Sequence, residues 1–173
     1  MGLASGTRSP NQSENDVLFS LGTKERQSGP SWGPSSGNQC ERADFIVDSG
    51  ASTSAVPAYI GSKYPLQDDP HRKVYTSASG HEVTNQGIRT LKCSFQSGET
   101  EKLAFKVMPV QRALVSVSQS VLAGNRIVFD SEANGGSYIM NHRTGSCKRI
   151  YEKGGVFVLP CWIEEPDRSD FGR

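Results

Sequence analysis

The sequence predicts an all-β fold with one short helix. From Ala43 onward, apolar residues come in short bursts, and each burst is bounded by Gly, Asn, Asp, Ser or Pro, which is the pattern of strands and turns. Residues 88–96 and 103–107 alternate apolar and polar side chains, and this period of two places one face of a strand against a core. Only residues 116–125 favour a helix.

Length and composition limit the chain to one folded domain of modest size. Its 173 residues are 35% hydrophobic and 8% aromatic, which is enough for one core and too little for two lobes. Residues 1–40 are rich in Gly, Ser and Pro and predict a disordered linker. We therefore expect the domain over residues 41–165, followed by a polar tail over residues 166–173.

The strands follow in order along the domain. Residues 45–47, Phe-Ile-Val, predict a fully buried strand. The alternating runs 88–96 and 103–107 flank the turn signal Ser-Gly-Glu and predict a hairpin, which Pro109 ends. Four later runs, separated by loops rich in turn formers, predict further strands: RIVF, SYIM, CKRI and GVFVL.

The helix and the last strands carry three more expectations. Ser118 is predicted as the N-cap of the helix, and Gly124 with Asn125 supplies a left-handed stop. Trp162 is expected to close the core. Cysteines 147 and 161 are interpreted as half-buried strand residues, not as nucleophiles.

Charge and hydropathy argue against nucleic-acid and membrane partners. The 19 basic and 18 acidic residues leave a formal charge of +1, which provides no global attraction to nucleic acid or to anionic lipid. The basic runs at residues 71–73 and 148–153 are too small and too mixed in charge for a nucleic-acid patch. The sequence shows no signal peptide, and its longest apolar stretch, residues 156–163, is too short to span a bilayer.

Cysteine and histidine spacing predicts neither disulfides nor a metal site. The four cysteines are widely spaced and form no paired ligand motif, so we expect a reduced, cytoplasmic chain. His71, His81 and His142 are far apart in sequence and lack ligand spacing. We therefore expect no metal and no cofactor.

The stretch DFIVDSGASTSAV, residues 44–56, contains the candidate for catalysis. Asp48 ends an apolar strand, Gly50 permits close approach of the backbone, and Val56 resumes the apolar run. One interpretation is an ordinary turn after a buried strand, because Asp, Ser and Gly all favour turns. The wider pattern favours a catalytic carboxylate instead.

This stretch resembles the active-site motif of aspartic proteases of the retroviral and retrotransposon kind, and DSGAS resembles the form found in Copia-type Gag-Pol polyproteins. The resemblance covers about residues 43–163 in order. The turn ASGH within VYTSASGHEVTNQGI resembles the flap hairpin of the family, and ALVSV resembles the two apolar residues and small residue before its helix. The run from LAGNRIVFD to VLPCWI resembles the strands that close the Copia-type protease region.

The resemblance implies a retropepsin-like acid protease fold, with a single lobe, a closed β-barrel-like sheet, a flap hairpin and one short helix. It implies that the catalytic motif is Asp48, Ser49 and Gly50. In the family pattern, the hydroxyl of Ser49 cross-links two active-site loops, and the amide of Gly50 donates to the carboxylates. Substrate-binding positions are implied at the floor, at the flap and before the helix: Ala51, Ala78, Ser79, Gly80, Leu114, Val115 and Ser116. An ordinary surface hairpin is the alternative interpretation of the flap residues.

Peptide hydrolysis of this kind needs two carboxylates. One is ionised and one is protonated, because like charges held close together cannot both ionise, and activity is then expected on the acidic side of neutrality. The chain has one Asp-Ser-Gly motif, and Asp130-Ser131-Glu132 lacks the glycine and is interpreted as a turn. We therefore expect the second carboxylate to come from a second copy of the chain, in a two-fold homodimer.

The sequence thus predicts an aspartic endopeptidase, a hydrolase that cuts extended peptides or the polyprotein of a transposable element. It is expected in the cytoplasm, including virus-like particles. The alternative is a catalytically inactive retrotransposon-derived relic that serves as a dimeric peptide-binding or adaptor module. A nucleic-acid-binding capsid fragment would need a basic stripe or a zinc knuckle, and the sequence shows neither.

Overall fold

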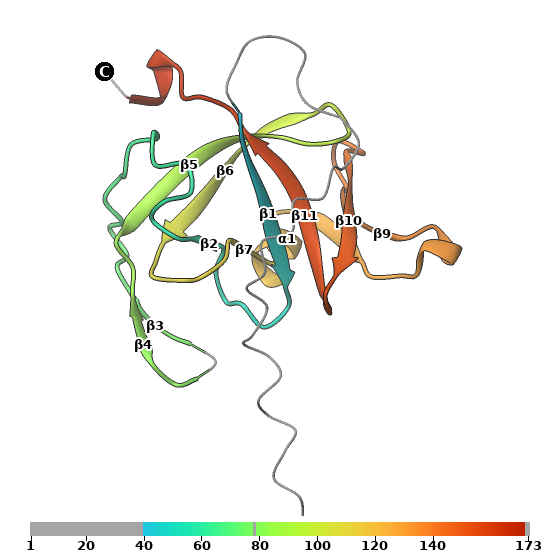
Figure 1. Ribbon diagram of the computed structural model, residues 1–173, viewed down its shortest axis with the longest axis horizontal. Helices are drawn as coiled ribbons and strands as arrows, with labels where there is room; N and C mark the ends of the chain where they lie inside the picture. Colours follow the sequence, from blue (N-terminus) through green and yellow to red (C-terminus); the bar gives the residue numbers. More distant parts are fainter. Residues whose placement is uncertain (1–39, 78, 172–173) are drawn as a thin grey trace, which may run out of the picture. The chain divides into compact units, whose positions relative to one another are not determined.

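The computed structural model describes residues 40–77 and 79–171. Within them lie a nine-stranded sheet, a two-stranded sheet, one α-helix and two short 3-10 helices (Figure 1). The predicted all-β class with one short helix is therefore confirmed for these residues. Residues 1–39, expected as a linker, and the expected flap residue Ala78 lie outside them.

The elements have the following bounds. The first six strands are β1 (Glu41–Asp48), β2 (Ala55–Val56), β3 (Val74–Thr76), β4 (Glu82–Thr84), β5 (Gly87–Ser94) and β6 (Thr100–Val107). After them come β7 (Leu114–Ser116), α1 (Val117–Leu122), β8 (Asn125–Val128), η1 (Glu132–Asn134), β9 (Ser137–Asn141), β10 (Cys147–Lys153), β11 (Val156–Ile163) and η2 (Arg168–Phe171).

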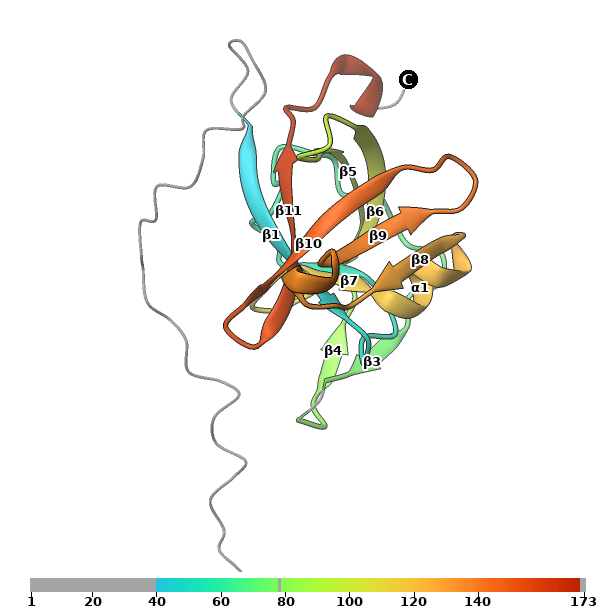
Figure 2. The ribbon, with the colours of Figure 1, turned by 90° about the vertical axis from the view of Figure 1, so that its right-hand side faces the viewer.

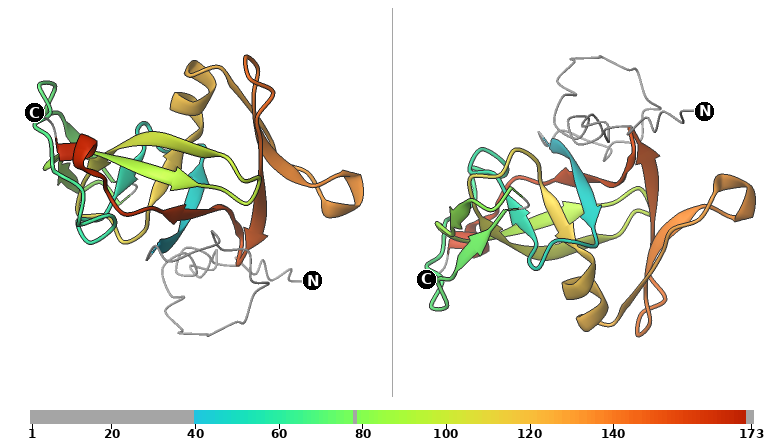
Figure 3. Two further views of the ribbon diagram at one scale, coloured as in Figure 1. Left: turned by 90° about the horizontal axis from the view of Figure 1, so that it is seen from above. Right: turned by 90° about the horizontal axis from the view of Figure 1, so that it is seen from below.

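The large sheet closes on itself. Its order is β1-β7-β2-β6-β5-β11-β10-β9-β8, and an additional pairing of β1 with β11 joins the first six of these strands into a ring. One edge of β11 pairs with β1, while its other edge pairs first with β10 and then with β5. Strands β10, β9 and β8 therefore leave the ring as an arm, which is visible in Figure 2 and in both views of Figure 3.

The hairpin of β5 and β6 follows directly from the sequence pattern. The two strands pair in antiparallel register from Gly87 opposite Val107 to Ser94 opposite Thr100. Leu91 and Cys93 are fully buried, because the period of two turns every second side chain of β5 into the ring. The predicted hairpin is confirmed.

The inside of the ring is the hydrophobic core. Phe45 on β1 is fully buried and packs against Phe105 on β6, with ring centroids 5.0 Å apart. The expectation that residues 45–47 are fully buried was wrong, because Ile46 is half-buried. Strand β1 has neighbours on both edges, but only its inward face is covered, so its side chains alternate.

The helix begins earlier than predicted. Ser116, not Ser118, is the N-cap of α1, and its hydroxyl accepts a hydrogen bond from the amide of Gln119 at 3.3 Å. The helix starts here because Ser116 is the last residue of β7, whose extended backbone is the conformation of an N-cap. Gly124 follows in the left-handed conformation with φ +83°, which confirms the predicted stop.

Two expectations on the late strands were wrong. Trp162 does not close the core: its neighbours Cys161 and Ile163 point inward, so the indole faces outward under the guanidinium of Arg42, 5.9 Å from the ring centroid. Cys161 is fully buried and Cys147 is exposed, so neither is half-buried. Alternation along each strand decides both outcomes.

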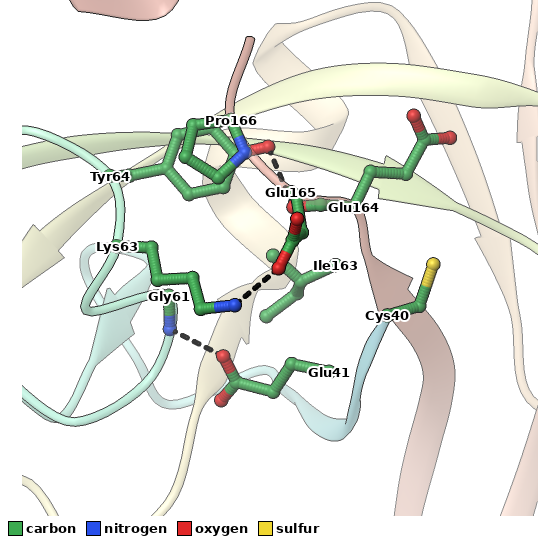
Figure 4. A pocket seen from close by; sticks show the side chains of 9 residues that line it. All are labelled: Cys40, Glu41, Gly61, Lys63, Tyr64, Ile163, Glu164, Glu165 and Pro166. Carbon is green, nitrogen blue, oxygen red and sulfur yellow. Dashed lines mark hydrogen bonds and ion pairs between the residues drawn. The ribbon is translucent and has the colours of Figure 1, made fainter. Parts of the chain in front are cut away.

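The polar segment after β11 lies against the ring. Glu164 pairs with Lys92 at 2.7 Å, and Asp170 in η2 pairs with Lys102 at 2.7 Å. Figure 4 shows the small pocket of about 200 Å³ that this segment forms with the start of β1, where Lys63 is paired with Glu165. None of the helices among the described residues is long and apolar enough to cross a membrane.

Candidate active site

Asp48 is placed by the pairing of two strands that are far apart in sequence. It is the last residue of β1, and β7 runs parallel to β1 with Ser116 opposite Asp48. The amide of Ile46 also donates to the carbonyl oxygen of Ala113 at 2.8 Å. The structure thus brings the expected catalytic motif beside the expected residues Leu114, Val115 and Ser116.

The Asp48 carboxylate is held by its own loop. Its Oδ1 accepts a hydrogen bond from the backbone amide of Gly50 at 2.7 Å. Its Oδ2 has no hydrogen-bond or ion-pair partner among residues 40–77 and 79–171. Asp48 is half-buried, while Ser49 and Gly50 are exposed, so one carboxylate oxygen is fixed and the other is left without a partner among these residues.

The loop after β1 is tied to the start of α1 by side chains. The buried hydroxyl of Ser116 donates to the carbonyl oxygen of Ala51 at 2.7 Å. The amide of Ser116 donates to Ser54 Oγ at 3.0 Å, and the amide of Ser54 donates to Gln119 Oε1 at 2.7 Å. Gln119 Nε2 also donates to Thr53 Oγ1 at 3.3 Å. These bonds fix the loop that carries Asp48.

Three of these positioning residues were missed from the sequence: Thr53, Ser54 and Gln119. The run Ser-Thr-Ser after Ala51 was the available signal, because hydroxyl side chains in a loop commonly bond to nearby backbone groups. Nothing in the sequence indicated that their partner would be Gln119, which lies 65 residues from Ser54.

The expected flap is a hairpin in the structure. Strands β3 and β4 pair with each other in antiparallel register and form the separate two-stranded sheet. Gly80 lies at its turn with φ +82°, and Ser79 Oγ lies 3.0 Å from His81 Nδ1. In Figures 1 and 2 the hairpin extends on the side of the ring where β1 ends. Among the described residues, no hydrogen bond joins this hairpin to Asp48.

A buried ion pair fixes the base of the hairpin. The Asp69 carboxylate is buried and bound by the ammonium of Lys106 on β6 and by the side-chain amide of Asn85, which follows β4. Asn85 Oδ1 in turn accepts from the amide of Gly87 at 2.9 Å. The hydrogen bond from Lys106 lowers the pKa of Asp69 below its usual value. No pattern in the sequence indicated this network.

The described part of the chain shows no metal-binding group of side chains. Within residues 40–77 and 79–171, no three His, Cys, Asp or Glu side chains come together as a ligand group. Asp130, in the Asp-Ser-Glu segment, precedes the short helix η1, and its Oδ1 accepts from the amide of Ser131 at 2.7 Å. This segment is a turn, as predicted.

Comparison of the chain with protein-family models, with curated proteins and with solved structures gave no match.

Proposed function

We propose that the chain is a retropepsin-like aspartic endopeptidase of the kind that Copia-type retrotransposons encode, and that it acts as a homodimer. The observation that carries the proposal is the position of Asp48. It ends a strand of the closed sheet, its Oδ1 is bound by the Gly50 amide at 2.7 Å, and its Oδ2 is left for water or for a second carboxylate. The motif in the sequence supports the same chemistry.

The proposed mechanism needs Asp48 from each of two copies. The ionised carboxylate takes a proton from a water molecule, which attacks the scissile carbonyl carbon, while the protonated carboxyl donates a hydrogen bond to the carbonyl oxygen. The Gly50 amide orients each carboxylate. Ser49 is exposed, and a side chain that is to reach the loop of the partner must be exposed. Val115 on β7 is buried and lies opposite Val47, the residue before Asp48.

The proposed substrate is an extended peptide. The hairpin of β3 and β4 has exposed backbone at Ser79 and Gly80, and its two strands pair only with each other among the described residues. Free strand edges bind extended peptides through main-chain hydrogen bonds. Closure of such a hairpin over the peptide would exclude water from the two carboxylates.

Cleavage assays of the purified full chain test the proposal. We would measure hydrolysis of a mixed peptide library and of a peptide that spans residues 1–40, from about pH 4 to about pH 7. Asp48→Asn is expected to lower the rate by at least about 100-fold, because it removes the proton-accepting group. Asp68→Asn is the matched control, since Asp68 is exposed and pairs with Arg72 at the surface. A pepstatin-class inhibitor should abolish the same activity.

Mixing of subunits tests the shared site. When equal amounts of Asp48→Asn and wild-type chain exchange subunits, about half of the wild-type chains enter mixed dimers, so activity per wild-type chain should fall to about half. An unchanged activity would show that one chain is sufficient. A folded dimer that cuts no peptide at any pH would instead support the inactive relic that acts as an adaptor module.

A further inference from the structure

A second pocket, outside the Asp48 site, lies where the arm of β8, β9 and β10 meets β11. It has a volume of about 530 Å³. Three aromatic residues and three carboxylates line it: Phe129, Tyr151, Phe157, Asp130, Glu132 and Glu152. No lysine or arginine is among its lining residues, so its charged groups have one sign. We call it the aromatic-acidic pocket.

The aromatic side of the pocket is fixed but open. The rings of Phe129 and Phe157 pack at a tilt, with centroids 4.7 Å apart. Phe157 also packs against the core, whereas Phe129 remains 43% exposed. The hydroxyl of Tyr151 donates to Gln96 Oε1 at 2.5 Å. An aromatic ring that is partly exposed and held in place by its neighbours can attract a cation through its quadrupole.

The acidic side is held by hydrogen bonds that leave oxygens unused. The buried Ser137 hydroxyl bonds to both the amide and the carbonyl of Asp130, at 2.8 Å each, which fixes this residue to β9. Asp130 Oδ1 accepts from Ser131 and Asn134, and Glu152 Oε1 accepts from the amide of Gly155 at 2.6 Å. The second oxygen of each carboxylate has no partner among the described residues.

The neighbouring cations do not neutralise these two carboxylates. Arg149 pairs with Glu132 at 2.7 Å, so the negative charge of Glu132 is neutralised. Lys153, next to Glu152 in sequence, pairs with Asp44 on β1 at 3.0 Å. Among the described residues no ion pair joins Asp130 or Glu152, so about two uncompensated negative charges lie in the pocket with the partly exposed Phe129.

We propose that the aromatic-acidic pocket binds the cationic side chain of a lysine or an arginine in a peptide segment. The aromatic rings receive the alkyl stem and the face of the cation, and the free oxygens of Asp130 and Glu152 accept its N–H groups. This function goes beyond the proposed protease and does not depend on it, because binding requires neither Asp48 nor a second copy of the chain.

An NMR titration of the isotope-labelled full chain with short blocked peptides tests the proposal. The probes are Ac-Ala-Lys-Ala-NH2 and Ac-Ala-Arg-Ala-NH2, with citrulline in place of arginine as the neutral isostere. Amide resonances of Phe129, Asp130 and Glu152 should shift saturably with the two cationic peptides. Binding of the citrulline peptide should be weaker by at least about fivefold, because it lacks the charge.

Variants locate the site. Phe129→Leu and Glu152→Gln should each weaken binding of the lysine peptide by about two- to fivefold, and Gln keeps the acceptor for the Gly155 amide. Asp68→Asn is the control: it removes an exposed carboxylate that does not line the pocket, and it should leave binding of the lysine peptide unchanged. Equal binding of citrulline and arginine, unchanged binding in both pocket variants, or shifts confined to other residues would each overturn the proposal.

Discussion

The hydroxyl of Ser116 donates a hydrogen bond to the carbonyl oxygen of Ala51 at 2.7 Å and accepts one from the amide of Gln119 at 3.3 Å. One fully buried side chain thus joins the loop after β1 to the first turn of α1, across 65 residues of sequence. Because the same loop carries Asp48, the position of the candidate catalytic carboxylate depends on Ser116.

Ser116→Ala is expected to lower the free energy of unfolding by about 1–3 kcal/mol, because it removes an N-cap and the hydrogen bond to the carbonyl oxygen of the half-buried Ala51. Urea denaturation at neutral pH measures the loss. Ser97→Ala is the matched control, since Ser97 is exposed in the turn after β5 and its side chain makes no hydrogen bond among residues 40–77 and 79–171, and its effect should stay within about 0.5 kcal/mol. Equal losses in the two variants would contradict the assignment of the cap.

Local patterns in the sequence were sufficient for several elements. The alternation along β5 and β6 predicted their hairpin, because a period of two is a property of each strand alone. Gly80 and Gly124 predicted a turn and a helix stop, and both have positive φ. The site motif was found for the same reason, since Asp48, Ser49 and Gly50 are contiguous.

Long-range relationships could not be predicted from local patterns. The parallel pairing that places Ser116 opposite Asp48 depends on the closure of the sheet, which no local pattern encodes. Because the sheet closes into a ring, each strand has one inward and one outward face, and Ile46 and Trp162 lie on the outward face although both belong to strongly apolar runs. Asp69 looks like a surface residue in sequence, and only the fold brings Lys106 to it.

The ion pair of Asp69 predicts a pH dependence of stability. Its pKa is lowered in the folded protein, chiefly by the hydrogen bond from Lys106, so it contributes stability above the pKa of the unfolded chain and loses it as pH falls through the folded pKa. Asp69→Asn should therefore lower the unfolding midpoint at pH 7. The difference in unfolding midpoint between Asp69→Asn and wild type should become smaller as pH falls below about 4.

Thermal unfolding of the two proteins at a series of pH values measures this dependence. Asp68→Asn serves as the control, because Asp68 is exposed and pairs with Arg72 at the surface, where ion pairs contribute little. The difference in unfolding midpoint between wild type and Asp69→Asn could instead stay constant from pH 7 to about pH 3. That result would show that the charge of Asp69 does not contribute to stability.

Phe45→Ala tests the core beneath the site. Phe45 is fully buried against Phe105, so truncation should cost about 3–5 kcal/mol of unfolding free energy. Leu122→Ala, at a side chain that is 88% exposed, should change it by no more than about 0.5 kcal/mol. Chemical denaturation measures both. A small loss at Phe45 would mean that the inward face of β1 is not packed as described.

Gly80→Ala and Gly80→Asn test the hairpin without a steric clash. No atom lies within 4 Å of a Cβ at this position, so only the backbone conformation, φ +82°, distinguishes the two variants. Asn adopts positive φ more readily than Ala, and the Ala variant should lose about 1 kcal/mol more. If the hairpin closes over substrate, cleavage should fall more in Gly80→Ala than in Gly80→Asn. Equal cleavage rates in the two would argue for an ordinary surface hairpin.

Gly50→Ala separates the geometry of the carboxylate from the stability of the fold. Gly50 is exposed and is not among the glycines of positive φ, so alanine fits its backbone, but the added Cβ would lie 3.3 Å from Asp48 Oδ1. The carboxylate must then move by a few tenths of an ångström. If Asp48 is catalytic, kcat/KM should fall by about 10-fold or more, while the urea midpoint stays close to that of wild type. Full activity in a stable Gly50→Ala protein would mean that the 2.7 Å hydrogen bond between Gly50 and Asp48 is only a turn contact.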